Sequence, residues 1–134
     1  MKRPSFLTLD EVLSLHADRV AKYGGALGVR DLGALQSALA MPAATFAGEL
    51  LHPTLAEMAA AYLFHLCQAH AFVDGNKRVA LAATLAFLEL NDHELVAPPD
   101  DLYDLVIGIA AGRRAKAEAA VFLGRHLRSL RSRK

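Results

Sequence analysis

The feature that most constrains the fold is a ten-residue segment, Val79 to Leu88, which is apolar on nearly every side and interrupted only by Thr84. A helix that is apolar all round is stable only where other elements cover it, so this segment predicts a helix at the centre of a bundle. It is far too short to cross a bilayer. The aromatic share of the chain is only 7%, and a composition dominated by alanine and leucine favours packed helices over sheets.

Helix-start signals mark further helices around this centre. Thr8 and Glu11 form a capping box, in which each side chain satisfies a free N–H group at a helix start. Asp31 is a second candidate cap, and prolines followed by acids open a later helix at Pro98. The predicted helices begin near Thr8, Asp31, Leu55, Val79, Pro98 and Lys116, and the last carries its apolar stripe as far as Leu130. The sequence therefore predicts one all-α domain over residues 1–134, a compact bundle of about five to six helices with a small glycine-rich flap or hairpin at residues 24–29.

Net charge, cysteine content and the lack of long apolar stretches indicate which partners and which cell compartment to expect. The formal net charge of +1 implies no general attraction to nucleic acid or anionic lipid. The single cysteine, Cys67, lies in an apolar helical pattern and is expected to be a buried, inert thiol. No signal peptide or membrane-spanning stretch is evident, so we expect a cytoplasmic protein with no membrane partner.

The segment from His70 to Arg78 has an unusual composition for a connector between buried helices. The start of a buried helix offers unpaired N–H groups and a positive dipole end, and Lys77 adds charge to this anion site. Gly75 lets the backbone approach a phosphate closely. Asp74 would repel a bare phosphate and therefore indicates a bridging Mg²⁺, while the His70 imidazole can accept a proton from an incoming hydroxyl. These residues suit nucleotide-dependent transfer.

The same segment resembles the signature loop of the Fic superfamily, His-x-Phe-x-Asp/Glu-Gly/Ala-Asn-Lys/Gly-Arg, and matches it at every specified position. Residues 28–39, 88–91 and 101–112 are similar to the death-on-curing branch, which comprises toxins of toxin–antitoxin systems, so the resemblance covers roughly residues 7–127. It implies a Fic/Doc fold. By this resemblance His70 is the general base, Asp74 is the Mg²⁺ ligand and Phe72 anchors the loop on the core. The implied phosphate ligands are Gly75, Asn76, Lys77 and Arg78, and the implied target-positioning flap, acting by main-chain pairing, is Gly28, Val29 and Arg30.

Two positions bear on which group is transferred. AMP-transferring Fic enzymes usually carry glycine at the position of Lys77 and a second arginine at that of Leu81, whereas this chain resembles the toxins described as kinases. Gly75 instead resembles the AMP-transferring Fic enzymes, because the type toxin of the death-on-curing branch has alanine at this position. The resemblance implies a toxin that transfers phosphate from ATP to a Ser/Thr hydroxyl of a target protein, by resemblance elongation factor Tu. The alternatives are AMP transfer onto a protein hydroxyl and a catalytically silent corepressor that binds an antitoxin.

The regulatory partner is expected on another chain. Many Fic enzymes carry an inhibitory Ser/Thr-x-x-x-Glu-Gly/Asn helix, and the near match Thr45 to Glu49 is followed by Leu50 instead. A separate cognate antitoxin is therefore predicted, with DNA contacted only through it. The cations near the C-terminus predict a solvated end, or alternatively a basic patch for DNA or an acidic partner. The spacing of His65 and His70 does not match a zinc-binding helix, and surface or satisfied positions are expected for His16, His52, His93 and His126.

Overall fold

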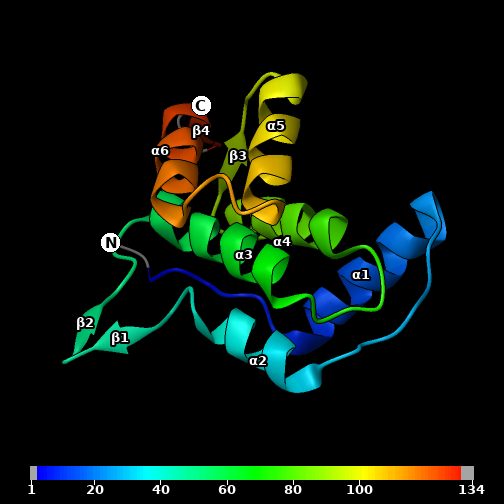
Figure 1. Ribbon diagram of the computed structural model, residues 1–134. Helices are drawn as coiled ribbons and strands as arrows, with labels where there is room; N and C mark the ends of the chain where they lie inside the picture. Colours follow the sequence, from blue (N-terminus) through cyan, green and yellow to red (C-terminus); the bar gives the residue numbers. More distant parts are fainter. Residues whose placement is uncertain (1–2, 131–134) are drawn as a thin grey trace.

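The computed structural model describes residues 3–130, which form six α-helices and two small antiparallel sheets (Figure 1). The helices are α1 (Leu9–Tyr23), α2 (Leu32–Ala40), α3 (Leu55–Ala69), α4 (Asn76–Leu90), α5 (Pro99–Ala110) and α6 (Lys116–His126). The strands are β1 (Thr45–Phe46), β2 (Glu49–Leu50), β3 (His93–Leu95) and β4 (Leu127–Ser129), paired β1 with β2 and β3 with β4. The predicted all-α class is confirmed.

Helices α3 and α4 form the centre of the bundle. Helix α3 packs against α2, α4, α5 and α6, while α1 lies against α4 (Figure 1). Val79, Ala83 and Phe87 of α4 are fully buried, as expected for the apolar segment, but Leu85 is 38% exposed, so the segment is not covered on every side as predicted. The hydroxyl of its one polar residue, Thr84, donates to the backbone oxygen of Ala80 at 2.8 Å, which satisfies it inside the core. Helix α3 is more enveloped than its one-face stripe predicts, because every residue of 58–63 is buried.

The predicted helix starts are confirmed except at α4, which begins at Asn76, three residues before the predicted start near Val79. Thr8 and Glu11 make both bonds of the capping box at α1, and the Asp31 carboxylate accepts from the N–H of Ala34 at 3.0 Å at the start of α2. Pro99 occupies the first position of α5, where its missing N–H leaves no bond unmade. These local signals hold because caps depend on neighbours in sequence.

Of the two forms predicted for the glycine-rich segment 24–29, a flap or a hairpin, the structure has the flap. The segment forms no hairpin, and its one pairing is an isolated antiparallel bridge between Val29 and Phe72. The hairpin lies instead at β1–β2, where Ala47 and Gly48 both have positive φ, 53° and 82°, as a tight two-residue turn requires. That hairpin occupies the near match to the inhibitory motif, so the match does not form a helix.

The last helix also ends earlier than its apolar stripe predicts. Helix α6 stops at His126, and β4 then pairs with β3, His93 opposite Ser129 and Leu95 opposite Leu127. The pairing partner is more than thirty residues away, so a periodicity within the helix cannot reveal it. The C-terminal cations Arg131, Arg133 and Lys134 lie outside the described residues.

The fold bears on the single cysteine and on membrane-spanning helices. Cys67 is 1% exposed, which confirms the expected buried thiol, and burial raises the pKa of that thiol to about 11, which disfavours the reactive thiolate. Within residues 3–130, none of the helices combines the length and the apolar character that crossing a membrane requires.

Candidate functional site

The loop from α3 to α4, residues 70–75, is bounded by two residues in the left-handed conformation. His70 ends α3 with φ 47° and ψ 41°, and Gly75 precedes α4 with φ 75° and ψ 22°. Histidine tolerates this region better than most side chains, and glycine adopts it freely. The loop therefore turns sharply at both ends and holds His70 and Asp74 exposed at the surface.

A reciprocal pair of hydrogen bonds closes the loop. The N–H of Phe72 donates to Asn76 Oδ1 at 3.0 Å, and Asn76 Nδ2 donates back to the oxygen of Phe72 at 3.1 Å. The Phe72 side chain is 2% exposed and joins the core. The Asn76 amide is thus engaged in holding the loop, and what Asn76 can offer a phosphate is its backbone N–H.

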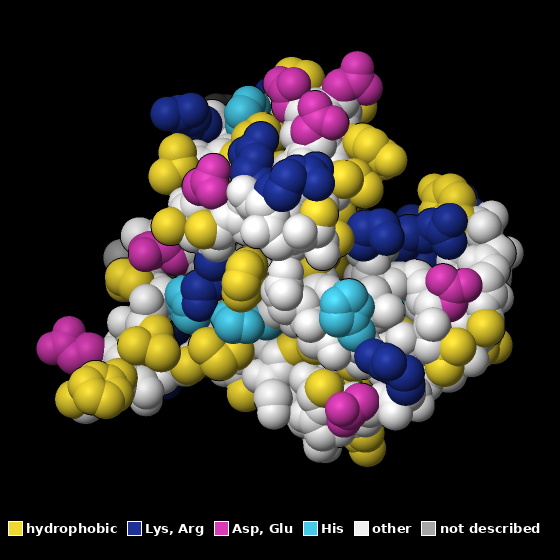
Figure 2. Space-filling view, in the orientation of Figure 1, with side chains coloured by type: hydrophobic (Ala, Val, Ile, Leu, Met, Phe, Trp, Pro, Cys, Tyr) yellow, Lys and Arg dark blue, Asp and Glu magenta, His cyan; other side chains and the backbone are white. Residues whose placement is uncertain are grey.

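Helix α4 begins without a side-chain cap. Gly75 has no side chain to accept a hydrogen bond, whereas hydroxyl or carboxylate side chains cap α1, α2 and α3. The first N–H groups of a helix, here those of residues 76–78, have no partner within the helix. Lys77 and Arg78 are exposed beside them. In the space-filling view Lys and Arg side chains gather where α1 ends and α4 begins (Figure 2), so this candidate anion site has the charge and the free donors that suit a phosphate.

The carboxylate of Asp74 lies between this helix start and the flap. The N–H of Gly75 donates to its Oδ1 at 2.9 Å, and the N–H of Ala26 donates to its Oδ2 at 3.3 Å. Gly25 approaches so closely that an added Cβ would lie 2.7 Å from Oδ2. A carboxylate offers about four lone-pair positions, so Asp74 keeps acceptor capacity for a further ligand.

The segment predicted as a flap lies alongside the loop. The N–H of Arg30 donates to the oxygen of Ala71 at 2.7 Å, and the N–H of Val73 donates to the oxygen of Gly28 at 3.0 Å. These two bonds flank the pair Val29 and Phe72, so in antiparallel geometry the N–H and C=O of Val29 point away from the loop. The flap therefore presents one unoccupied main-chain edge to solvent.

Two arginines of the predicted site hold backbone groups in this structure. Arg30 donates from Nε and a terminal nitrogen to the oxygen of His70, at 3.1 and 2.6 Å. Arg78 donates to the oxygen of Gly24 at 3.2 Å, and its guanidinium lies 5.5 Å from the centre of the Tyr23 ring. Leu81 lines the adjoining pocket of about 230 Å³. The structure thus gathers the flap, the loop and the start of α4 into one surface.

Sequence reasoning left His16 without a role at this site. This α1 residue is 3% exposed, its Nε2 lies 2.7 Å from the oxygen of Asp74, and its ring stacks on Phe72 with the centroids 3.9 Å apart. It is therefore a satisfied histidine, as expected, but one that touches the loop. The sequence signal for this contact was the position of His16 in the apolar stripe of α1, which predicts that the side chain faces the core.

His65 and His52 lie outside this site. Burial, with the nearby Lys116, lowers the pKa of His65 to about 4, and Lys116 Nζ donates to His65 Nε2 at 3.1 Å. Burial also lowers the pKa of His52, whose Nδ1 donates to the oxygen of Met41. Within residues 3–130 no group of three or more His, Cys, Asp or Glu side chains is arranged to hold a metal ion.

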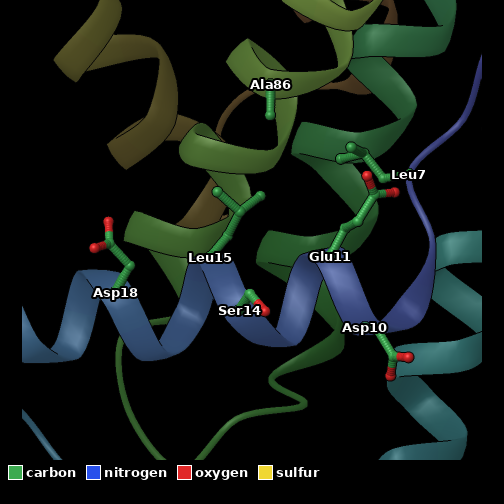
Figure 3. Close-up of a pocket in the computed structure, with 7 residues that line it drawn as sticks. All are labelled: Leu7, Asp10, Glu11, Ser14, Leu15, Asp18 and Ala86. Carbon is green, nitrogen blue, oxygen red and sulfur yellow. The ribbon is translucent and has the colours of Figure 1, made fainter.

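A separate groove of about 450 Å³ runs between α1 and α4 (Figure 3). Leu7, Leu15 and Ala86 give it apolar lining, and Asp10 and Glu11 add carboxylates. None of the loop residues lines this groove, so its surface is available for a contact other than the anion site.

Comparison with known proteins gives two kinds of match. The family model described as Fic/DOC family matches residues 6–88, which include the whole loop and the flap. A protein named Toxin Doc, from Mycolicibacterium smegmatis, is 45% identical over 95 residues, 71% of this chain and 71% of that protein. A protein named Protein kinase doc, from Escherichia phage P1, is 34% identical over 116 residues, 87% of this chain and 90% of that protein.

Proposed function

The chain belongs to the Fic/DOC family, and we propose that it is the toxin of a toxin–antitoxin system that phosphorylates a Ser/Thr hydroxyl of a target protein with ATP. The relatives named as a toxin and as a protein kinase support this proposal. By the same family resemblance, the proposed target is elongation factor Tu.

One observation carries the proposal. The start of α4 is uncapped, it presents the N–H groups of residues 76–78 together with Lys77 and Arg78, and the exposed Asp74 and His70 stand in the loop that leads into it. Unpaired N–H donors and two cations at a helix start attract phosphate. A connector that is merely solvated does not require this combination of residues.

The chemistry assigned to the chain is a direct transfer. The target hydroxyl oxygen forms a bond to the γ-phosphorus, the bond from that phosphorus to the bridging oxygen breaks, and ADP leaves. His70 takes the proton from the attacking hydroxyl. The N–H groups at the start of α4, with Lys77, stabilise the charge that spreads over the transferred group, which is most of what such catalysis requires.

The residues present fit a Mg²⁺ ion that is shared with the nucleotide. Mg²⁺ is usually held by one or two carboxylates together with substrate phosphates, not by a cage of protein ligands. Asp74 supplies one exposed carboxylate with spare acceptor capacity, and the described residues contain no such cage. When bound, Mg²⁺ neutralises phosphate charge, and Asp74 would hold it at the phosphate-facing side of the loop.

The outer edge of the flap suits a target segment. The N–H and C=O of Val29 point away from the loop, and an extended peptide that pairs with such an edge is aligned by main-chain bonds without regard to its sequence. We propose that the target strand pairs there, which brings its hydroxyl toward the loop. Arg30 supports the edge through its bonds to His70.

Phosphate transfer is favoured over AMP transfer by two side chains of α4. Lys77 puts a long, exposed cation where AMP-transferring relatives keep glycine, and Leu81 lines the pocket beside Arg78 where they carry a second arginine. Filling one end of the anion site and weakening the other disfavours the pose that presents the α-phosphate to His70.

The proposed cognate antitoxin fits the groove between α1 and α4. An apolar lining flanked by the carboxylates of Asp10 and Glu11 is complementary to an amphipathic helix with basic side chains. Ser14→Arg puts a positive charge in this groove and is expected to weaken antitoxin binding at least tenfold by calorimetry. Ser37→Arg, at an exposed position of α2, is the control, and equal affinities of the two variants would move the antitoxin elsewhere.

Paired labelling tests the proposed reaction. The purified protein is incubated with Mg²⁺ and lysate, or with purified elongation factor Tu, and with ATP labelled at either the γ or the α position. The proposal predicts protein-bound label from the γ position only. Label from the α position only would show AMP transfer. Unlabelled protein in both reactions, with a well-folded chain, would refute the proposed transfer and is the result expected of the silent corepressor.

A further inference from the structure

His16 has no exposed surface of consequence, yet it is polar. It lies on the buried side of α1 between Val12 and Val20, one turn from each, and is 3% exposed. A buried imidazole is tolerated only where its nitrogen finds a partner. That partner belongs to the α3–α4 loop, 58 residues further along the chain.

The hydrogen bond requires a hydrogen atom on Nε2 of the ring. Nε2 lies 2.7 Å from the backbone oxygen of Asp74, and a carbonyl oxygen can only accept. Nε2 therefore carries the hydrogen and donates it. The face of the same ring stacks on Phe72, at a centroid separation of 3.9 Å and an interplanar angle of 19°, so His16 grips the loop at two points.

These contacts fix one peptide group of the loop from both sides. His16 holds the C=O of the peptide that joins Asp74 to Gly75, and the Asp74 carboxylate holds its N–H at 2.9 Å. Gly75 lies directly against the imidazole, because an added Cβ would stand 3.5 Å from Nε2. The orientation of this peptide sets the left-handed turn from which α4 starts.

We propose that His16 is a positioning residue for the transfer reaction, acting through the Asp74–Gly75 peptide to aim the first N–H groups of α4 at the transferred phosphate. The inference rests on the proposed function for its catalytic consequence. His16 itself touches no reacting atom. The Asn76–Phe72 bonds close the loop independently of His16. Loss of His16 should therefore leave the loop formed, but with the first N–H groups of α4 turned away from the transferred phosphate.

Two substitutions separate the ring from the hydrogen bond. His16→Phe keeps an aromatic face for Phe72 and removes the donor, whereas His16→Gln keeps an N–H donor on a flexible side chain. Misplacement of catalytic groups by about an ångström costs up to ~100-fold in rate, so His16→Phe is expected to lower kcat about 10- to 100-fold. The KM for ATP should change much less, because the charges of Lys77 and Arg78 remain. His16→Gln should recover part of the loss.

The matched control is Val12→Ala, one turn earlier on the same buried side of α1. It removes core packing without touching the Asp74 carbonyl, so it should lower stability while kcat per folded molecule stays within about twofold of wild type. The amide resonances of Gly75 and Asn76, followed by NMR without nucleotide, should shift in His16→Phe and stay near their wild-type positions in Val12→Ala.

The outcomes separate this inference from the proposed function. Wild-type kcat in folded His16→Phe, or equal losses in all three variants in proportion to their unfolded fractions, would overturn the positioning role. If His16→Phe does not fold, His16→Gln serves as the test. A His16→Gln chain with wild-type kcat and with Gly75 and Asn76 resonances at their wild-type positions would also overturn the positioning role. If wild type transfers no label, the proposed function fails, and unshifted Gly75 and Asn76 resonances in His16→Phe would then refute the contact separately.

Discussion

Replacing Asn76 by alanine should destabilise the protein even though the residue lies within a segment that resembles a nucleotide-binding signature. The substitution removes the bonds that Asn76 exchanges with the backbone of Phe72, at 3.0 and 3.1 Å. Each such bond contributes about 0.5–1.5 kcal/mol net, and leaving a partly buried N–H and C=O without partners adds to the loss. The better helix propensity of alanine offsets about 0.5 kcal/mol.

The expected loss in the free energy of unfolding is therefore about 2 kcal/mol, which for a chain of this length corresponds to a fall in Tm of roughly 8 °C. Urea unfolding followed by circular dichroism, without nucleotide, measures it. Asn76→Asp is the matched variant, because its carboxylate still accepts from the N–H of Phe72 but cannot donate to its oxygen. It should lose about half as much, helped by a negative charge at a helix start.

An Asn76→Ala chain whose unfolding free energy lies within 0.5 kcal/mol of wild type would refute this reasoning. So would an Asn76→Asp chain that is less stable than Asn76→Ala, because the bond to the Phe72 N–H would then contribute nothing. Either result would return Asn76 to the role of a phosphate ligand.

Three further predictions follow from the site and its surroundings. Asp74→Asn should raise the Mg²⁺ concentration needed for half-maximal transfer, because an amide oxygen binds a hard cation less well than a carboxylate; an unchanged metal titration would remove Asp74 as a ligand. Lys77→Ala should weaken ATP binding about tenfold by calorimetry through the loss of a charge-assisted bond, while Arg125→Ala on α6 should not, and equal affinities would move the phosphates elsewhere. Folding lowers the pKa of His65 from its usual value of about 6.5 to about 4. The neutral side chain therefore contributes stability that is lost as the pH falls from about 6.5 to 4. This contribution is about 1–2 kcal/mol after allowing for the partial exposure of the side chain. His65→Asn should flatten that part of the stability–pH curve, and an unchanged slope would contradict the assignment.

The sequence predicts this fold well where the signals are local. Thr8 and Asp31 cap helices because a cap needs only neighbours three residues away. Most of the apolar run of α4 lies in the core, as its composition predicts, although Leu85 stays 38% exposed. The end of α6 was missed because the strand that follows it pairs with a segment more than thirty residues away.

The sequence indicates candidate site residues by their chemistry but not the contacts that they make. The sequence indicates His70, Asp74 and the cations of the loop, since their chemistry is legible from side-chain types. It does not show that the Asn76 amide is engaged with Phe72, or that His16 reaches the loop from α1. Both contacts depend on how distant helices pack, which no spacing within a segment encodes.

The measurement that tests the central claim most directly is the rate of ATP-dependent labelling of the target by wild type and by His70→Ala. His70 is exposed, but alanine suits its left-handed conformation less well than histidine does, so the substitution should lower the free energy of unfolding by no more than about 1 kcal/mol. Loss of a general base should lower the transfer rate about 10²–10⁴-fold. A well-folded His70→Ala chain that labels its target at the wild-type rate would contradict the account, because the proton of the attacking hydroxyl would then leave by another route.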